Sequence, residues 1–270
     1  MVPWAGLAQH LVALVVYPGA VLTLAVGLLA EGAALFAIRH ASPRTAAVAP
    51  IRRLPDTLAT SWPVVAGVAV MCMLAATQLA VPLNPVSPLE RNSMVAAVAL
   101  AAAVWLSHGW TWSAPGARVT LVVQACWLVA VLAPAVLSQT LRPQVLGAIA
   151  LPAQLPLKVL SALLYLTCLP YLLQLVGNGG PGARMAAARV FLWLPFCGLG
   201  VSLFLPPQPG DLPGALRFVG ATLAVALIAV GLGAVLTRRF VSDGRSPYLR
   251  LAAALAGVVL AVAIVTTALT

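Results

Sequence analysis

Charge is scarce in this sequence. Only 7% of its 270 residues are Asp, Glu, Lys or Arg, whereas a soluble globular domain carries roughly a quarter. With 62% hydrophobic residues and a mean hydropathy of +1.05, the chain cannot cover a surface that faces water. The low charge excludes a disordered chain, a coiled coil and a large soluble catalytic domain, and it predicts an integral membrane protein.

Residue patterns for metal, nucleotide or nucleophile chemistry are also missing. The four cysteines stand singly, without the C-x-x-C pair that holds zinc or an iron–sulfur cluster. The three histidines lie at or outside the ends of apolar runs, so no pair of them can hold a haem inside a bundle. No P-loop, Gly-rich dinucleotide turn or Ser/His/Asp set occurs. We therefore expect no cofactor bound by this chain alone and no catalytic or metal-ligating residues.

The apolar residues form long continuous runs. About 20 such residues span 30 Å of hydrocarbon as a helix, and a transmembrane barrel would alternate instead. The runs predict an all-α polytopic bundle, a single transmembrane domain over residues 1–270. The proline-rich stretch 143–157 is shorter, which favours a connection or a half-helix over a span. About eight spans follow, at 11–38, 62–81, 93–108, 119–138, 159–176, 185–205, 216–236 and 249–269.

The basic residues predict the orientation of these spans. With eight spans, eleven of the fifteen bases fall on one side, and short loops rich in Lys and Arg mark the cytoplasm. Both termini are then outside, and the loop 39–61 is cytoplasmic. Because Arg outnumbers Lys fourteen to one, as in GC-rich bacterial genomes, we expect the inner membrane of a bacterium. The eleven bases are Arg39, Arg44, Arg52, Arg53, Arg118, Arg184, Arg189, Arg238, Arg239, Arg245 and Arg250.

The same bases bear on the partners of the chain. They are spread over four short loops without aromatic residues between them, which is unlike a nucleic-acid surface. We expect no nucleic-acid partner. Anionic lipid or an acidic protein on the cytoplasmic face fits the pattern better.

Glu31 is the one acid, out of five, that falls inside a predicted span. It precedes Arg39 by eight residues, which is about 12 Å along a helix. Inserting an ionisable group into the membrane at that depth costs on the order of 2.5 to 3.5 kcal/mol, so such a group marks a functional site by default. The alternative is that Glu31 reaches the interface or pairs with an arginine of the cytoplasmic loops and only fixes helix packing. One buried acid does not make a proton relay, so the chain is poorly equipped to pump alone.

Several segments resemble a known family. The first span V-V-Y-P-G-A-V-L-T-L-A-V-G-L-L-A-E-G, the Arg-rich A-I-R-H-A-S-P-R-T and the later A-P-I-R-R-L-P-D are similar to the start of one protein family. This family is the quinone-site membrane subunit (subunit 1) of respiratory complex I, with its counterparts in membrane-bound nickel–iron hydrogenases. The segment L-P-Y-L-L-Q-L-V-G-N-G-G-P-G-A-R-M-A-A-A-R resembles the connection between that family's fifth and sixth spans. L-F-L-P-P and T-R-R-F-V-S-D-G-R-S-P-Y-L-R resemble later segments, and the eight-span topology agrees.

The resemblance implies a non-catalytic membrane subunit of an oxidoreductase complex, of the NADH–quinone oxidoreductase or hydrogenase kind. It would anchor peripheral electron-transfer subunits, with quinone bound at an interface. A quinone cavity or proton path would involve Glu31, Arg39, Arg44 and Asp56. Subunit docking would involve Arg52, Arg53, Arg238, Arg239 and Arg245.

The chain also departs from the family pattern. Leu35-Phe36 stand where the family carries an Arg-Lys pair, and no acid occurs between Lys158 and Asp211, where the family has several Glu residues. These differences imply a divergent, acid-poor member. Two other hypotheses remain open from the residues themselves. One is a transporter of small solutes or lipids in which Glu31 binds a proton or cation, and the other is a membrane scaffold without chemistry.

Overall fold

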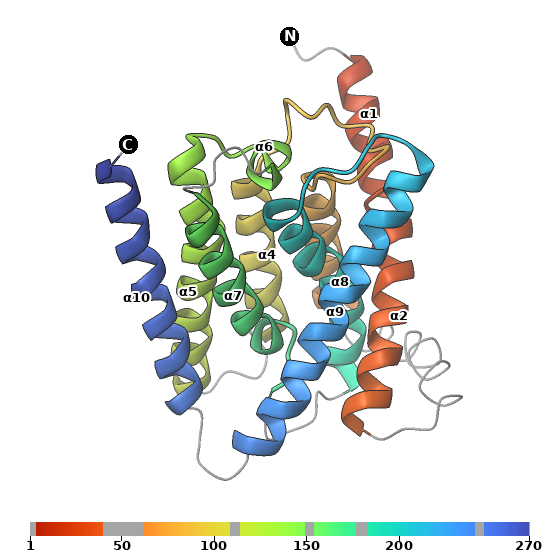
Figure 1. Ribbon diagram of the computed structural model, residues 1–270. Coiled ribbons are helices and arrows are strands. Elements are labelled where there is room, and N and C mark those ends of the chain that lie inside the picture. The colour runs from red at the N-terminus through yellow and green to blue at the C-terminus, as the bar shows by residue number, and fades with distance from the viewer. Residues whose placement is uncertain are drawn as a thin grey trace.

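The computed structural model describes residues 4–39, 62–108, 114–148, 154–176, 183–240 and 246–269. Within these residues all regular structure is helical, and the helices form one bundle (Figure 1). The helices are α1 (Trp4–Val15), α2 (Ala20–Arg39), an unlabelled helix Trp62–Thr77, α4 (Ser93–His108), α5 (Ala114–Ser138), α6 (Pro143–Gly147), α7 (Leu155–Leu172), α8 (Ala183–Phe204), α9 (Leu212–Phe240) and α10 (Ser246–Leu269).

Five helical segments are long and apolar enough to cross a membrane. They are Gly6–Ala37, Ala117–Ser138, Leu155–Leu172, Leu212–Leu236 and Pro247–Ala268. Three further apolar helices, Trp62–Thr77, Ser93–Ser107 and Ala188–Phe204, are shorter than 18 residues. The prediction of a helical multi-pass membrane protein is confirmed, whereas the count of eight spans stays a prediction.

The predicted first span, 11–38, contains a break between α1 and α2. Residues 16–19 form turns there, because Pro18 has no N–H to donate to the preceding turn. A Cβ atom on Gly19 would lie 1.8 Å from the carbonyl oxygen of Leu14, so the break needs glycine at this position. The hydroxyl of Tyr17 donates a hydrogen bond to the carbonyl of Pro82 at 2.9 Å and ties the break to the loop 78–92.

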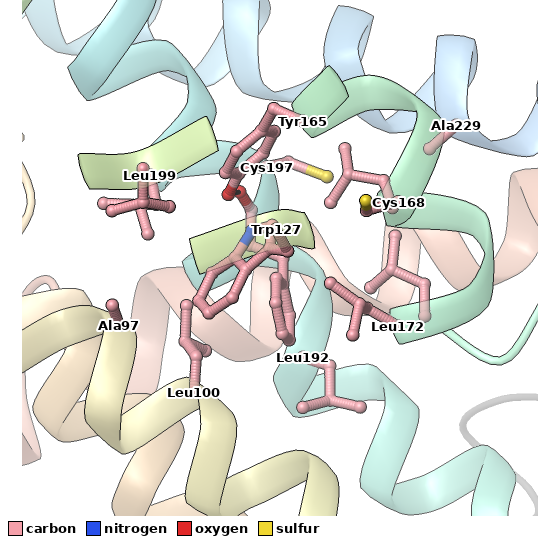
Figure 2. Packing of buried hydrophobic residues seen from close by; sticks show 14 of the residues in the cluster. Ala97, Leu100, Trp127, Tyr165, Cys168, Leu172, Leu192, Cys197, Leu199 and Ala229 are labelled. Carbon is pink, nitrogen blue, oxygen red and sulfur yellow. Dashed lines mark hydrogen bonds between the residues drawn. The ribbon is translucent and has the colours of Figure 1, made fainter. Parts of the chain in front are cut away.

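Helix α8 is the centre of the bundle. It packs against α2 and α9 on one side and also contacts α4, α6 and α7, while α5, α7 and α10 pack together as a second group. Figure 2 shows where the groups meet, with Trp127 of α5 and Tyr165 of α7 directed toward α8. The Trp127 and Phe196 rings are 5.3 Å apart, and the Tyr165 hydroxyl donates a 2.6 Å hydrogen bond to the Phe196 carbonyl. The four cysteines are buried and free.

The two ends of the bundle differ in charge. At one end α1 begins and α10 ends, and we call it the termini end (Figure 1). At the opposite end α2 and α9 end, and α5, α8 and α10 begin. Seven of the eight arginines of the described helices lie at this second end, which we call the arginine-rich end. They are Arg39, Arg118, Arg184, Arg189, Arg238, Arg239 and Arg250.

A buried arginine holds the loop 78–92 at the termini end. Arg91 is 6% exposed and makes five hydrogen bonds to main-chain carbonyls. The acceptors belong to Leu79, Val81, Asn84 and Val86, with donor–acceptor distances from 2.8 to 3.3 Å. Burial lowers the pKa of Arg91 to about 10, which still leaves the guanidinium charged at neutral pH. The loop 78–92 is therefore folded around the Arg91 side chain, whose hydrogen bonds hold its conformation.

Replacing Arg91→Gln should destabilise the protein by about 2–4 kcal/mol, because several buried carbonyls would lose their donors. Thermal unfolding in detergent, followed with a thiol-reactive dye that reports exposure of the buried cysteines, measures the effect. Arg217→Gln is the matched control, since Arg217 is exposed at the same end. An Arg91→Gln protein as stable as this control would show that the loop does not depend on the guanidinium.

Candidate functional site

Glu31 lies on the face of α2 that packs against α8. This face consists of small and apolar residues, and Glu31 is 1% exposed among them. Gly27, one turn earlier, touches the backbone of α8, since a Cβ atom there would lie 1.9 Å from the Val190 carbonyl oxygen. Glycine therefore lets the two helices approach closely at the level of the carboxylate. The buried residues of the face are Thr23, Val26, Gly27, Ala30, Glu31, Ala34 and Leu35.

Arg189, in the second turn of α8, pairs with Glu31 through two hydrogen bonds. Its Nε donates to Glu31 Oε2 at 2.7 Å, and its Nη2 donates to Oε1. Trp193, one turn further along α8, donates from its indole Nε1 to Oε2 at 3.2 Å. Arg189 is 4% exposed, so the bidentate pair is shielded from solvent on both sides.

The ion pair continues into a hydrogen-bond network at the arginine-rich end. Arg189 Nη1 donates to the carbonyl of Gln174, just after α7, at 3.4 Å. Gln174 has a φ of 56°, a left-handed conformation that is uncommon outside glycine and asparagine. Its side-chain amide donates to the Ser107 hydroxyl on α4 at 3.0 Å. The network thus joins α2, α8, the end of α7 and α4.

The geometry limits what Glu31 can do chemically. Both carboxylate oxygens already accept hydrogen bonds, and the positive charge of Arg189 balances the negative charge of Glu31. A cation would have to displace a guanidinium that is held bidentately, which is the strongest geometry for such a pair. Nor do the described residues hold a cluster of three or more His, Cys, Asp or Glu side chains for a metal. The arrangement is suited to holding α2 against α8 through a buried ion pair, and it is poorly suited to binding a cation.

The remaining predicted site residues lie at or beyond the ends of the described segments. Arg39 ends α2, and Arg238 and Arg239 belong to the last turn of α9, so their helices reach the arginine-rich end. The predicted sites at Arg44, Arg52, Arg53, Asp56 and Arg245 lie outside the described residues.

The sequence interpretation missed Arg189 as a partner of Glu31 and counted it with the bases of the cytoplasmic side. Its position seven residues into α8, inside the predicted span 185–205, was the available signal. Comparison with known proteins found no family model that matches the chain and no similar curated protein.

The losses of stability caused by removing Glu31 and Arg189 should not be additive. Glu31→Gln or Arg189→Gln alone leaves one buried charge without its counter-charge, which costs about 3–5 kcal/mol. The double variant leaves two neutral amides, and its loss should be clearly smaller than the sum of the single losses. The free energies of unfolding of the unmodified protein, the two single variants and the double variant, measured in detergent, give the interaction energy between the two side chains. Strictly additive losses would contradict a direct interaction.

Gly27→Ala should separate α2 from α8 at the level of the ion pair. The new methyl group would meet backbone rather than a movable side chain, and overpacking of this kind costs about 1–3 kcal/mol. Gly257→Ala on α10 is the matched control, because a Cβ atom there meets nothing within 4 Å. Detergent unfolding of the two variants checks this, and equal stability would argue against a tight helix crossing at Gly27.

Proposed function

We propose that this chain is an integral membrane subunit of a respiratory complex of the complex I or membrane-bound hydrogenase kind. Its role is to anchor peripheral electron-transfer subunits at the arginine-rich end. Electrons do not pass through it, and any quinone binds at an interface with other subunits. The localisation that accompanies this proposal is the bacterial inner membrane, with the arginine-rich end in the cytoplasm.

One observation carries the proposal. Two of the segments that resemble the quinone-site membrane subunit of complex I, 15–32 and 169–189, are far apart in sequence but meet at one buried site. The first supplies Glu31, and the second supplies both Gln174 and Arg189. Both members of the ion pair therefore lie in segments that carry the resemblance. The convergence favours the family hypothesis over a scaffold with unrelated helices.

The state of Glu31 favours membership of a complex over an autonomous ion transporter. A transporter of protons or cations needs a carboxylate that a substrate can reach, and Glu31 is 1% exposed and already bound by Arg189. The other acids of the described residues, Glu90 and Asp211, lie at the termini end and are exposed. Among the described residues, therefore, no series of acidic side chains crosses the bundle and offers a path to a proton. Coupling to ion movement would depend on partner subunits.

Docking at the arginine-rich end can be tested by affinity purification from the native membrane in mild detergent. The unmodified chain should bring down an iron–sulfur protein and an antiporter-like membrane subunit. Exchanging Arg238, Arg239 and Arg245 for Gln should release the peripheral iron–sulfur protein, because its acidic contacts would lose their counter-charges. Mass spectrometry of the eluates, together with the quinone-reductase activity of the eluate, gives the readout.

The matched control exchanges Arg217→Gln at the termini end, which should leave the complex intact. If the unmodified chain is recovered alone, without redox or antiporter-like partners, the proposed function is wrong. If the partners are retained by the triple variant, docking uses another surface. These two outcomes separate membership of a complex from the assignment of its docking residues.

A further inference from the structure

A cavity of about 430 Å³ opens at the termini end, between α5 and the loop that precedes α4. It lies where the candidate span Ala117–Ser138 ends, which is the depth of lipid headgroups if α5 crosses the bilayer. The lining residues are Leu89, Glu90, Arg91, Asn92, Ala135, Gln139, Thr140, Leu141 and Arg142.

Both walls of the cavity are held in place by hydrogen bonds. Arg91 fixes the wall from the loop 78–92 through its five carbonyl contacts. The Ser93 N–H and hydroxyl both donate to the carbonyl of Leu141, at 2.8 and 2.7 Å, and join this wall to the one that follows α5. The cavity is therefore part of the folded structure and does not depend on a loose loop.

The cavity is lined by charges of both signs. All five N–H groups of Arg91 are used inside its loop, whereas the Arg142 guanidinium donates no hydrogen bond to the described residues. The Glu90 carboxylate is exposed and meets the His10 imidazole of α1 at 3.6 Å. A ligand could therefore place an anionic group at Arg142 and an ammonium group at Glu90.

Below the cavity, the seam between α4 and α5 has an apolar surface. Gln124 of α5 donates to the Ala101 carbonyl of α4, so the two helices are in contact there. Between this contact and the cavity, Met94 and Val98 of α4 and Val136 of α5 are exposed. A headgroup in the cavity would bring its acyl chains onto this seam.

We propose that this cavity binds a phospholipid whose headgroup carries both a phosphate and a primary ammonium, as phosphatidylethanolamine does. The phosphate meets Arg142 and the positive field of Arg91, and the ammonium donates hydrogen bonds to Glu90. The acyl chains lie along the α4–α5 seam. A phosphate with a quaternary ammonium fits less well, because it cannot donate a hydrogen bond to the carboxylate.

Native mass spectrometry of the full chain in detergent tests the proposal with three lipids of equal chain length. Phosphatidylethanolamine should bind at least about tenfold more tightly than phosphatidylcholine or phosphatidylglycerol, since one charge-assisted hydrogen bond is worth that much. Glu90→Gln should remove the preference over phosphatidylcholine, and Arg142→Gln should weaken all three lipids. Asp211→Asn and Arg217→Gln, exposed charges at the same end, should leave binding unchanged.

Free phosphoethanolamine is the second arm of the experiment. It should compete only weakly, because it lacks the acyl chains. Competition as strong as that of the lipid would assign the cavity to a soluble zwitterion and overturn the lipid proposal. Equal binding of the three lipids, or a preference that survives Glu90→Gln, would also overturn it. A thermal unfolding curve for each variant verifies that the compared proteins are folded.

Discussion

The bundle depends on bringing one carboxylate and one guanidinium together in an interior that offers few other polar partners. Glu31 and Arg189 are each too costly to bury alone, and the pair becomes tolerable only with bidentate geometry and a further donor from Trp193. That geometry requires α2 and α8 to lie almost in backbone contact, which Gly27 permits. Because α8 also contacts α4, α6, α7 and α9, the helix that carries Arg189 fixes the position of most of the bundle.

The second buried guanidinium, that of Arg91, is stabilised in a different way. Arg91 has no carboxylate in its hydrogen-bond network and instead satisfies all five donors with main-chain carbonyls of its own loop. This arrangement leaves its net charge uncompensated, so Arg91 stays near the end of the bundle, where the cost of burial is smaller. Arg189 lies deeper in the helices and needs a counter-charge. The contrast explains why one arginine orders a loop and the other joins two helices.

The sequence predicted the apolar helices well and their polar contacts poorly. Continuous hydrophobic runs identify helices without reference to tertiary structure, and the predicted span 93–108 coincides with α4. Glu31 could be recognised because a lone acid in an apolar run is rare. The position of Arg189 inside the predicted span 185–205 marked it as a candidate partner, but it is 158 residues from Glu31, and only the packing of α2 on α8 decides which arginine meets the carboxylate. The role of Arg91 was missed for the same reason, since its acceptors are backbone atoms that leave no mark on the sequence.

The distribution of charge that remains after these pairings bears on assembly. With Glu31 bound to Arg189, the arginine-rich end keeps no other carboxylate among the described residues, because Glu90 and Asp211 belong to the termini end. In the predicted topology, eleven bases share that side with only Asp56, Asp243 and Glu31. Such an excess repels itself and attracts counter-charges from outside the chain. The peripheral subunit proposed above would supply such counter-charges through an acidic surface.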